Sequence, residues 1–476
     1  MQSRQKSTLA LSLLIGSALT CSAHTVEKPR HITFADSAHK KELNINVQLL
    51  DSVAVTNLSN AKTHYDNAIS IRLSLDGKLT DAFQFSSRVK VNTDYTNRNI
   101  NFNYYNPDEG IPYNKQSEKK RTWDLFAANL SYKLKPMTLL AGFDFIEWGP
   151  ARRTHVILRG ESNFYRPWQD SSSRIPDAAP TPYFGYQFVL GPLEYTQYAA
   201  KIYEKKGFGK YIHAHRLSMS LPKDVTLGLS ETSLYGTTTE KAGSNPNPDS
   251  DSTGRDFEWA YTIPFIPYVF QEHLQGDQDN ISLAFDLSVK TFPNWEFYAE
   301  LLWDDMKSPT SMFDDSWWGN KWATTLGLAR DNILIGPANL GWMFEYTRIE
   351  PWVYTHHKGT GYTYASYAQS LGSDLGPNSQ ELHTEINAAY KFLKATVFFG
   401  AVAKDTAFGG HINDLHTPES AMDKKFLNEK TTIRYKELGF NLAATPWDWL
   451  SFRCSYTRFF GDYKGYRTYA VGSLQW

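Results

Sequence analysis

The chain has 476 residues and a formal net charge of -1, so it lacks the basic surface typical of nucleic-acid-binding proteins, and we expect no nucleic-acid partner. Aromatic residues make up 15% of the sequence, with 28 Tyr, 28 Phe and 14 Trp, yet the mean hydropathy is -0.47. Beyond the N-terminal leader, no segment offers the roughly 18 uninterrupted apolar residues of a membrane-spanning helix. Many aromatic residues at low hydropathy are typical of a membrane β-barrel, whose strands alternate apolar and polar residues.

The N-terminal residues follow the pattern of a secretory signal. Two basic residues precede the apolar stretch LALSLLIGSAL, and the small residues in CSAHT favour cleavage after Ala23. We expect residues 1–23 to be a signal peptide and residues 24–42 to form a charged periplasmic arm. One of the two cysteines precedes the cut, so the mature chain keeps Cys454 alone and forms no internal disulfide.

Apolar and polar residues alternate with a period of two from the first predicted strands onward. Ile69, Ile71, Leu73 and Leu75 alternate with polar residues, and the same pattern resumes after the turn DGKLTD. A strand places these apolar residues on one face, whereas a helix would spread them round its axis. The pattern fits either a water-soluble β-sandwich or a membrane barrel.

The connections between strands distinguish these two folds. Strands are expected to start near Leu43, Asn67, Ala82, Thr122, Met137, Tyr183, Leu193, Tyr211, Val225, Asp279, Trp295, Lys321, Leu340, Glu381, Ala395, Lys430, Trp449 and Tyr466. Short turns such as LGPL, LPKD, TFPN and KFLK alternate with mostly long segments, as periplasmic turns and outer loops do in transmembrane barrels. A sandwich has no reason to sort its loops in this way.

We therefore predict an all-β fold: a transmembrane, antiparallel outer-membrane barrel of about 18 strands over residues 43–476, in a diderm bacterium. Its long extracellular loops are expected to fold into the lumen, and its outer face to contact outer-membrane lipid. The last strand, YRTYAVGSLQW, ends on Trp476. A terminal aromatic residue on an alternating strand resembles the signal that the barrel assembly machinery reads.

Two dense polar segments are predicted on the outer side. The stretch IEWGPARRTHVILRGESNFYRPW, residues 146–168, follows the fifth predicted strand, and RIEPWVYTHHKGTGYTYASYAQSLGSDLGPNSQEL, residues 348–382, follows the thirteenth. Aromatic faces stack on sugar rings, and Arg and carboxylate groups hydrogen-bond hydroxyls or pair with acidic substituents. Both segments are therefore candidates for polysaccharide binding.

Five pieces of sequence, in order, carry a family resemblance: EWGPARRTHVILRGESNFYRPW, AHRLSMSLPKDVTLGLSE, DNISLAFDLSV, RIEPWVYTH and SLGSDLGPNSQEL. Together they resemble the Wzi capsule-assembly family of outer-membrane proteins, from about Trp123 to the end of the chain. The resemblance implies a large monomeric barrel whose outer loops fold inward and which acts as a lectin for capsular or other surface polysaccharide. The N-terminal part departs from the family pattern, and a polar loop at residues 236–256 has no match.

The resemblance also supplies candidate binding residues. The first loop and the stretch around it contribute Trp148, Arg152, Arg153, Glu161, Arg166 and Trp168, and the second loop contributes Arg348, Glu350, Trp352, Tyr354, His356 and Asn378. For the arginines two interpretations stay open: they pair with Glu147 and Glu161 inside the barrel to pack the loop, or they bind the polysaccharide. The two are compatible, because a loop that fills a pore must pair its buried charges before the remainder can face a ligand.

Enzymatic sites are not expected. The pairs Asp304–Asp305 and Asp314–Asp315 are adjacent residues, which point to opposite faces of a strand. His213 and His215 share a strand face but have no third metal ligand nearby. We predict no catalytic residue, no metal and no cofactor. The alternatives to a lectin are a porin-type channel for small polar or sugar solutes and an enzyme that modifies lipid or polysaccharide.

Overall fold

The computed structural model describes residues 32–36, 41–58, 64–94, 121–160, 166–170, 180–202, 209–237, 256–276, 279–305, 309–313, 319–366, 369–414 and 425–476. The predicted signal peptide, residues 1–23, lies outside this described part, as does the polar run 244–253 within the unmatched loop. The predicted periplasmic arm at residues 24–42 includes the short strand β1 (Ile32–Asp36), which pairs with the start of β2.

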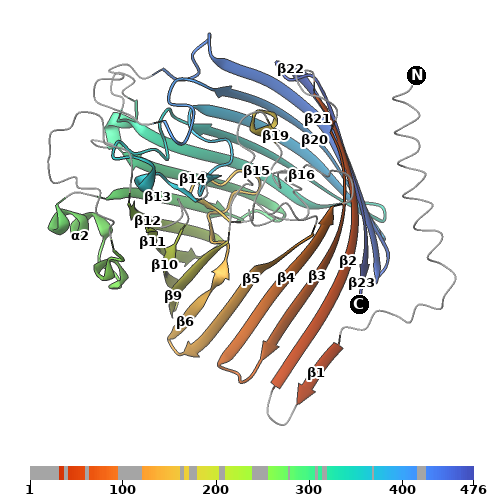
Figure 1. The fold of residues 1–476 in the computed structure, drawn as a ribbon, viewed down its shortest axis with the longest axis horizontal. Helices are drawn as coiled ribbons and strands as arrows, with labels where there is room; N and C mark the ends of the chain where they lie inside the picture. The colour runs from red at the N-terminus through yellow and green to blue at the C-terminus, as the bar shows by residue number, and fades with distance from the viewer. Residues whose placement is uncertain are drawn as a thin grey trace.

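A single antiparallel sheet forms the body of the molecule (Figure 1). Eighteen of its strands close into a ring, since β2 pairs both with β3 and with the last strand, β23. The strands of the ring are β2 (Lys41–Leu58), β3 (His64–Lys78), β4 (Phe83–Asp94), β5 (Arg121–Leu134), β6 (Met137–Asp144), β9 (Thr181–Leu190), β10 (Leu193–Lys201), β11 (Lys210–Leu221), β12 (Val225–Gly236), β13 (Asn280–Val289), β14 (Trp295–Asp305), β15 (Lys321–Ile335), β16 (Ala338–Ile349), β19 (Ser379–Tyr390), β20 (Leu393–Asp405), β21 (Thr432–Trp447), β22 (Leu450–Gly461) and β23 (Gly465–Gln475). The predicted barrel and its strand number are confirmed.

The alternation in the sequence becomes two faces of the barrel wall. Outward positions carry exposed large apolar side chains, among them Leu217, Leu229, Phe344 and Ile386. We call this outward apolar surface the lipid-facing band, because a closed barrel leaves no strand edge and only its side chains meet the bilayer. An exterior of this kind on a closed antiparallel barrel belongs to a protein of the outer membrane.

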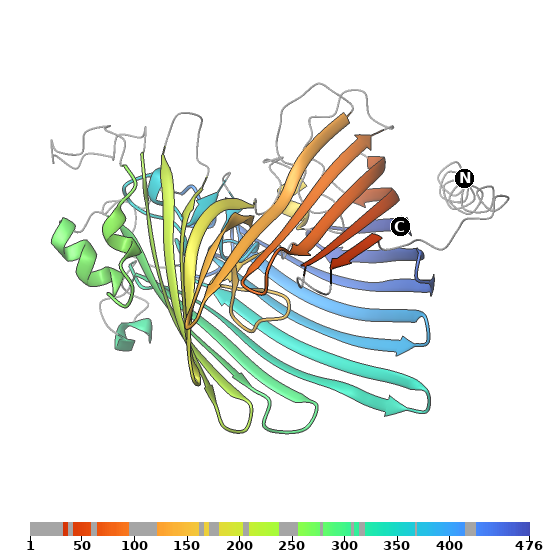
Figure 2. The same cartoon turned by 90° about the horizontal axis from the view of Figure 1, so that it is seen from below.

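The two ends of the barrel differ in their connections. Turns of a few residues join β5 to β6, β9 to β10, β15 to β16 and β19 to β20, as predicted. The opposite end carries the long connections, including residues 145–180, 237–279 and 350–378. Short turns mark the periplasmic end of bacterial barrels, so the long connections define the outer end. Figure 2 views the barrel from a second direction, with the strand ends and turns in sight.

Two of the long connections fold back into the lumen, which confirms the predicted inward loops. The first contains β7 (Glu147–Trp148), β8 (Leu158–Arg159) and η2 (Pro167–Asp170); the second contains η5 (Thr360–Tyr362), β17 (Ala365–Ser366) and β18 (Gln369–Ser370). Val156 and Ile157 of the first loop and Val353 of the second belong to one buried apolar cluster with wall residues such as Leu302. The loops therefore form a core inside the barrel.

Three further short elements lie in the outer connections: η3 (Trp259–Thr262), α2 (Tyr268–Gln275) and η4 (Pro309–Phe313). Among the residues that the structure describes, no helix is long and apolar enough to span a membrane.

Candidate functional site

The first inward loop turns at the WGP sequence against the barrel wall. Gly149 has a φ of +109°, a backbone conformation that side chains disfavour. A Cβ atom built on Gly149 would lie 2.0 Å from the Oε1 atom of Glu300. The glycine therefore allows the loop backbone to approach the strand carboxylate closely.

Two carboxylates on the wall hold the backbone of this loop. Glu300 on β14 accepts hydrogen bonds from the amides of Ala151, at 2.9 Å, and Val156, at 2.8 Å. Glu345 on β16 accepts one from the amide of Thr154 at 2.7 Å. A loop in a lumen must satisfy its backbone donors, and here the carboxyl groups of the wall do so.

The guanidinium groups of Arg153 and Arg166 lie inside the barrel against carboxylates of the wall, and both are buried. Arg153 bonds Glu381 and Glu437, each at 2.9 Å. Arg166 bonds Glu381 at 2.8 Å and Asp374 of the second loop at 3.0 Å. Buried charges persist only when paired. Both arginines therefore serve the packing of the loops.

The same carboxylates are the one group in the described residues with the spacing of a metal site. Oxygen and nitrogen atoms of Glu381, His383 and Glu437 lie within 4.8 Å of one another. The Nη2 atom of Arg153 already contacts both carboxylates, so a cation's place is taken by the guanidinium. The arrangement fits an ion-pair network and does not fit a metal centre.

Arg152 is the candidate nearest the periplasmic end of the lumen, and its side chain is about one-third exposed. Its guanidinium bonds Glu296 at 2.6 Å and Asp331 at 2.7 Å. The Asp331 amide bonds the carbonyl of Asn294, a residue of the periplasmic turn between β13 and β14. The exposed part of Arg152 therefore faces the periplasmic end of the lumen, away from the cell surface.

His155 forms the remaining charged contact of the first loop. Its Nδ1 atom lies 3.0 Å from Glu300, and the ring is buried. Burial opposes the charged form, but the Glu300 carboxylate, with help from Glu147 and Glu345, raises the pKa of His155 above its ordinary value. An imidazolium at this position adds an ion pair to the backbone contacts of Glu300.

The second inward loop is held in unusual backbone geometry at three candidate residues. Trp352, Tyr354 and Asn378 have φ values of 58°, 72° and 52°. Such conformations persist where surrounding contacts impose them. The Trp352 ring lies against Phe408, and the Asn378 amide donates to the carbonyls of Phe408 and Lys425.

Hydroxyl groups of the second loop bond the backbone of the first. Tyr354 donates to the carbonyl of Val156 at 2.9 Å, and Tyr364 donates to that of Ile157 at 2.8 Å. Both tyrosines are buried and stack on each other. With the ion pair between Arg166 and Asp374, these bonds make the two loops one plug, defined here as the described parts of residues 145–170 and 350–378.

Arg348 and Glu350 lie at the outer rim. The Thr325 hydroxyl on β15 donates to the carbonyl of Thr154 in the plug, so Thr325 faces the lumen. Thr347 on β16 lies opposite Thr325 and faces the same way. The next residue, Arg348, therefore faces outward. Arg348 bonds buried Glu350 at 2.7 Å, and its guanidinium covers the ring of Phe426 at 4.0 Å. The structure thus places Arg348 outside the lumen.

His356 and His357 lie at the outer mouth, with ring centroids 4.3 Å apart. Burial, and then the neighbouring charges of His357, Lys321 and Lys358, hold the pKa of His356 well below its ordinary value. His356 is therefore neutral at physiological pH. The exposed neighbour, His357, is the accessible member of the pair.

Trp148 and Trp168 differ in their accessibility. Trp148 is buried against Tyr198, while Trp168 is half-buried, with its ring centroid 5.9 Å from that of Tyr435. Half-buried Tyr463 contacts the other side of this cluster. Glu161 lies outside the described residues. Of the twelve candidates, Trp168 combines an aromatic ring with partial exposure at the outer side.

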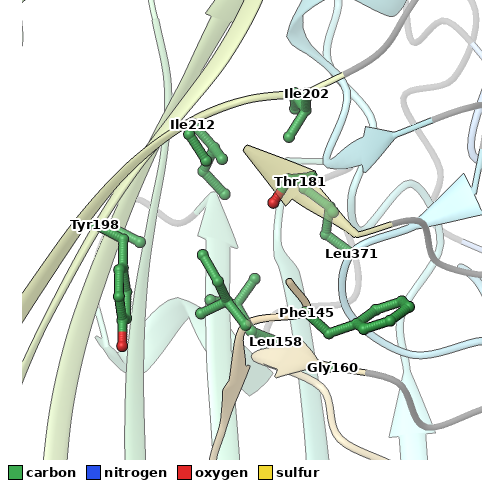
Figure 3. Close-up of a pocket in the computed structure, with 11 residues that line it drawn as sticks. Phe145, Leu158, Gly160, Thr181, Tyr198, Ile202, Ile212 and Leu371 are labelled. Carbon is green, nitrogen blue, oxygen red and sulfur yellow. The ribbon is translucent and has the colours of Figure 1, made fainter. Parts of the chain in front are cut away.

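An apolar cavity of about 30 Å³ separates the plug from strands β9 to β11 (Figure 3). Phe145, Leu158 and Leu371 of the two loops face Tyr198 and Ile212 of the wall across it. Ligand pockets usually measure about 300–1,000 Å³. This space is therefore a packing defect and not a sugar site.

The other residues considered from the sequence lie in different places. His213 and His215 lie on the outward face of β11, where His215 pairs with Glu231 at 2.9 Å. Asp304 is buried and accepts a hydrogen bond from the Tyr354 amide, whereas Asp305 is exposed. Asp314 and Asp315 lie outside the described residues.

Sequence reasoning missed the carboxylates that hold the plug. They are Glu296, Glu300, Glu345, Glu381 and Glu437, all on inward positions of strands. A signal for them exists, because acidic residues on inward positions of four strands complement an inserted loop with four arginines. The pairing itself joins residues up to 284 positions apart and is not visible locally.

Fold and site together define a class: an outer-membrane β-barrel of 18 strands whose lumen is filled by two inward loops. No protein-family model and no curated protein matches the sequence. Among solved structures, the chain is similar to Wzi of Escherichia coli, described as an outer-membrane protein involved in group 1 capsule assembly and a carbohydrate-binding β-barrel. The identity is 13%, the TM-score 0.56, and the match covers 90% of this chain and 84% of Wzi.

Two further solved structures also match. OpdK of Pseudomonas aeruginosa, solved with vanillate, is 9% identical with a TM-score of 0.48, over 91% of this chain and 98% of OpdK. OccAB4 of Acinetobacter baumannii is 10% identical with a TM-score of 0.48, over the same shares. At 13% identity, the likeness to Wzi shows the barrel fold alone.

Proposed function

We propose that the protein is a lectin-like outer-membrane barrel that holds capsular or other surface polysaccharide at the cell surface, as a member of the Wzi-like group. The observation that carries the proposal is the plug, whose two loops are joined by a buried ion pair and by hydrogen bonds inside the lumen. A filled lumen turns the outer end into a platform. The protein would act as a monomer, by binding alone, and catalyse no reaction.

The proposed binding surface uses the accessible residues of that platform. Trp168 and Tyr463 are half-buried aromatic residues there, and His357 is exposed. Aromatic rings stack on the C–H faces of sugars, and each contact is weak. A repeating polymer makes many such contacts at once, so modest affinity per site suffices to retain it. The buried candidates Arg153, Arg166 and Tyr354 support this surface from below.

Deletion of the gene tests the proposal directly. Cells without the protein should release polysaccharide into the medium, and the purified barrel should bind glycan extracted from its own host. Polymer that stays attached, together with a barrel that binds no host glycan, would contradict the function.

Substitution of Trp168 tests the surface. Trp168→Ala should lower glycan binding several-fold, because one stacking platform is lost, while the protein still migrates as a heat-modifiable folded barrel. Trp447→Ala is the matched control, since Trp447 is exposed at the periplasmic end. Equal binding by both variants would move the site away from Trp168.

A channel for small solutes is the second candidate function. A cavity of about 380 Å³ at the periplasmic end favours it, with Glu42, Asp76, Lys78, Gln84 and Asn129 among its lining residues. Planar bilayer recordings decide between the two functions. The lectin proposal predicts no steady conductance, whereas sustained single-channel currents would support the channel.

A further inference from the structure

The connection between β12 and β13 folds outward, unlike the two plug loops. Its described part, residues 256–276, contains η3 and α2, and we call it the outer flap. Both views show α2 beside the barrel, outside the ring of strands (Figures 1 and 2). Phe257 and Trp259 pack on Phe184, and Phe265 packs on Phe188, at 5.7 Å between ring centroids.

Strand register places the wall beneath the flap on the outward face. Gln197 of β10 lies opposite His215 of β11, which lies opposite Glu231 of β12. Leu217 follows His215 by two positions along β11, and Leu229 precedes Glu231 by two positions along β12. Both leucines are exposed, so His215 and Glu231 also stand at outward positions. Polar residues thus interrupt the lipid-facing band, and the flap covers them.

This polar row lies at membrane depth. A transmembrane strand needs about 9–11 residues to cross the hydrocarbon core. Leu221, the last residue of β11, lies beside the periplasmic turn, and His215 is only six residues from it toward the cell surface. Leaving Gln197, His215 and Glu231 against lipid would be unfavourable, so a cover is required there.

The flap is built to lie in a medium without water. In lipid, each unsatisfied backbone group costs several kcal/mol, so irregular segments there need partners. The wall supplies them in four contacts: Gln197 donates to the carbonyl of Tyr261, Tyr186 donates to that of Thr262, the Phe265 amide donates to the Tyr195 hydroxyl, and the Tyr268 amide donates to Glu231. Strand side chains thus form the hydrogen bonds that water would otherwise form with the flap backbone.

Much of the apolar surface of the flap is left uncovered by the wall. Trp259, Phe265, Phe270 and Leu274 have exposed fractions of 67%, 59%, 61% and 89%. These values exceed those of the lipid-facing strand residues below them, such as Leu217 at 39%. Apolar area of this kind on a water-facing loop would be costly.

We propose that the outer flap is a lipid-binding surface, whose apolar face lies among the acyl chains of the outer leaflet. The occupant follows from continuity, because the flap face prolongs the lipid-facing band of β9 to β12 toward the cell surface. The flap widens the barrel's lipid contact on one side. This proposal is independent of the polysaccharide function.

Nitroxide labelling tests the proposal in proteoliposomes made of phospholipid alone. The label is placed on Leu274→Cys in a Cys454→Ser background, and its collisions with oxygen and with a water-soluble nickel chelate are measured. Leu227→Cys, in the lipid-facing band, is the lipid control, and Ala407→Cys, exposed in an outer loop, is the water control. Heat-modifiability confirms that each labelled barrel is folded.

The expected result is a Leu274 label rich in oxygen collisions and poor in nickel collisions, close to the Leu227 label. A nickel accessibility equal to that of the Ala407 label would overturn the proposal. Poor access to both reagents would also overturn it, since the face would then be covered by protein, such as a second copy of the chain.

Discussion

The first plug loop and the outer flap both connect neighbouring strands at the outer end, yet they fold to opposite sides of one wall. The plug loop is held by ions: Arg153 and Arg166 share the Glu381 carboxylate. The flap is held mainly by uncharged groups, with Gln197, tyrosine hydroxyls and aromatic stacking at its contacts. The difference shows that the kind of contact depends on the surroundings: ion pairs hold the loop inside the lumen, and mainly uncharged contacts hold the flap on the lipid side.

Water that reaches the lumen at either end allows charges to be brought in and paired there, whereas lipid penalises any charge that is left imperfectly paired. Beneath the flap, His215 contacts Glu231 at 2.9 Å, and Glu231 also accepts a hydrogen bond from the Tyr268 amide. Removing a charge should therefore damage the plug, and removing a neutral donor should damage the flap.

Replacement of an arginine in the plug should have the largest effect. Arg153→Met leaves Glu437 buried without its cation and leaves Glu381 with Arg166 alone, which should cost about 3–5 kcal/mol. We expect faster hydrogen exchange across residues 149–158 and a lower unfolding midpoint in urea, with no change in the flap.

The control for that variant is Arg88→Met. Arg88 pairs with Asp144 at 3.3 Å, and its side chain is 43% exposed. Exposed pairs contribute about 0–1 kcal/mol. Equal losses in the two variants would show that burial does not set the strength of the plug contacts.

Loss of a neutral donor should have a smaller and separate effect. Gln197→Leu removes the hydrogen bond to the Tyr261 carbonyl and leaves that carbonyl buried, at a cost of about 1–3 kcal/mol. Hydrogen exchange should rise across residues 256–276 and stay constant in the plug. Gln84→Leu, on the lumenal side near the periplasmic end, should leave the flap unchanged; matching increases in both variants would refute a specific role for Gln197.

The sequence predicted the barrel well because its signal is local. Alternation with a period of two survives in almost every strand, and the predicted starts near Leu43, Tyr211 and Trp295 lie within two residues of the observed ones. The direction in which a loop folds is not local. It depends on partners such as Glu381 for Arg153, which are brought close only when the ring closes.

The same limit explains the candidate site. Arginines and tryptophans in the stretch 146–168 fit packing and binding equally well in sequence, and the structure assigns Arg153 and Arg166 to packing. For the flap, a local signal was present: Gln197, His215 and Glu231 stand at outward positions where apolar residues are expected. A polar residue at an outward position, where the alternation calls for an apolar one, thus indicates that another part of the chain covers the wall there.

A change of pH should have the smallest effect, confined to the plug. The folded pKa of His155 is raised by Glu300, so its contribution to stability is fully present below the unfolded value of about 6.5 and is lost as pH rises through the folded pKa. Each unit of elevation corresponds to about 1.4 kcal/mol. Hydrogen exchange at residues 149–158, corrected for its intrinsic pH dependence, should therefore increase from pH 6 to pH 9.

His155→Asn should remove that increase, because asparagine does not titrate in this range. His411→Asn is the comparison, since His411 is an exposed histidine in an outer loop, where its amide donates to Asp414. It should keep the pH dependence of the unmodified protein. If the increase persists without His155, another titrating group loosens the plug. The ion pair between His155 and Glu300 would then not be the reason that the plug responds to pH and the flap does not.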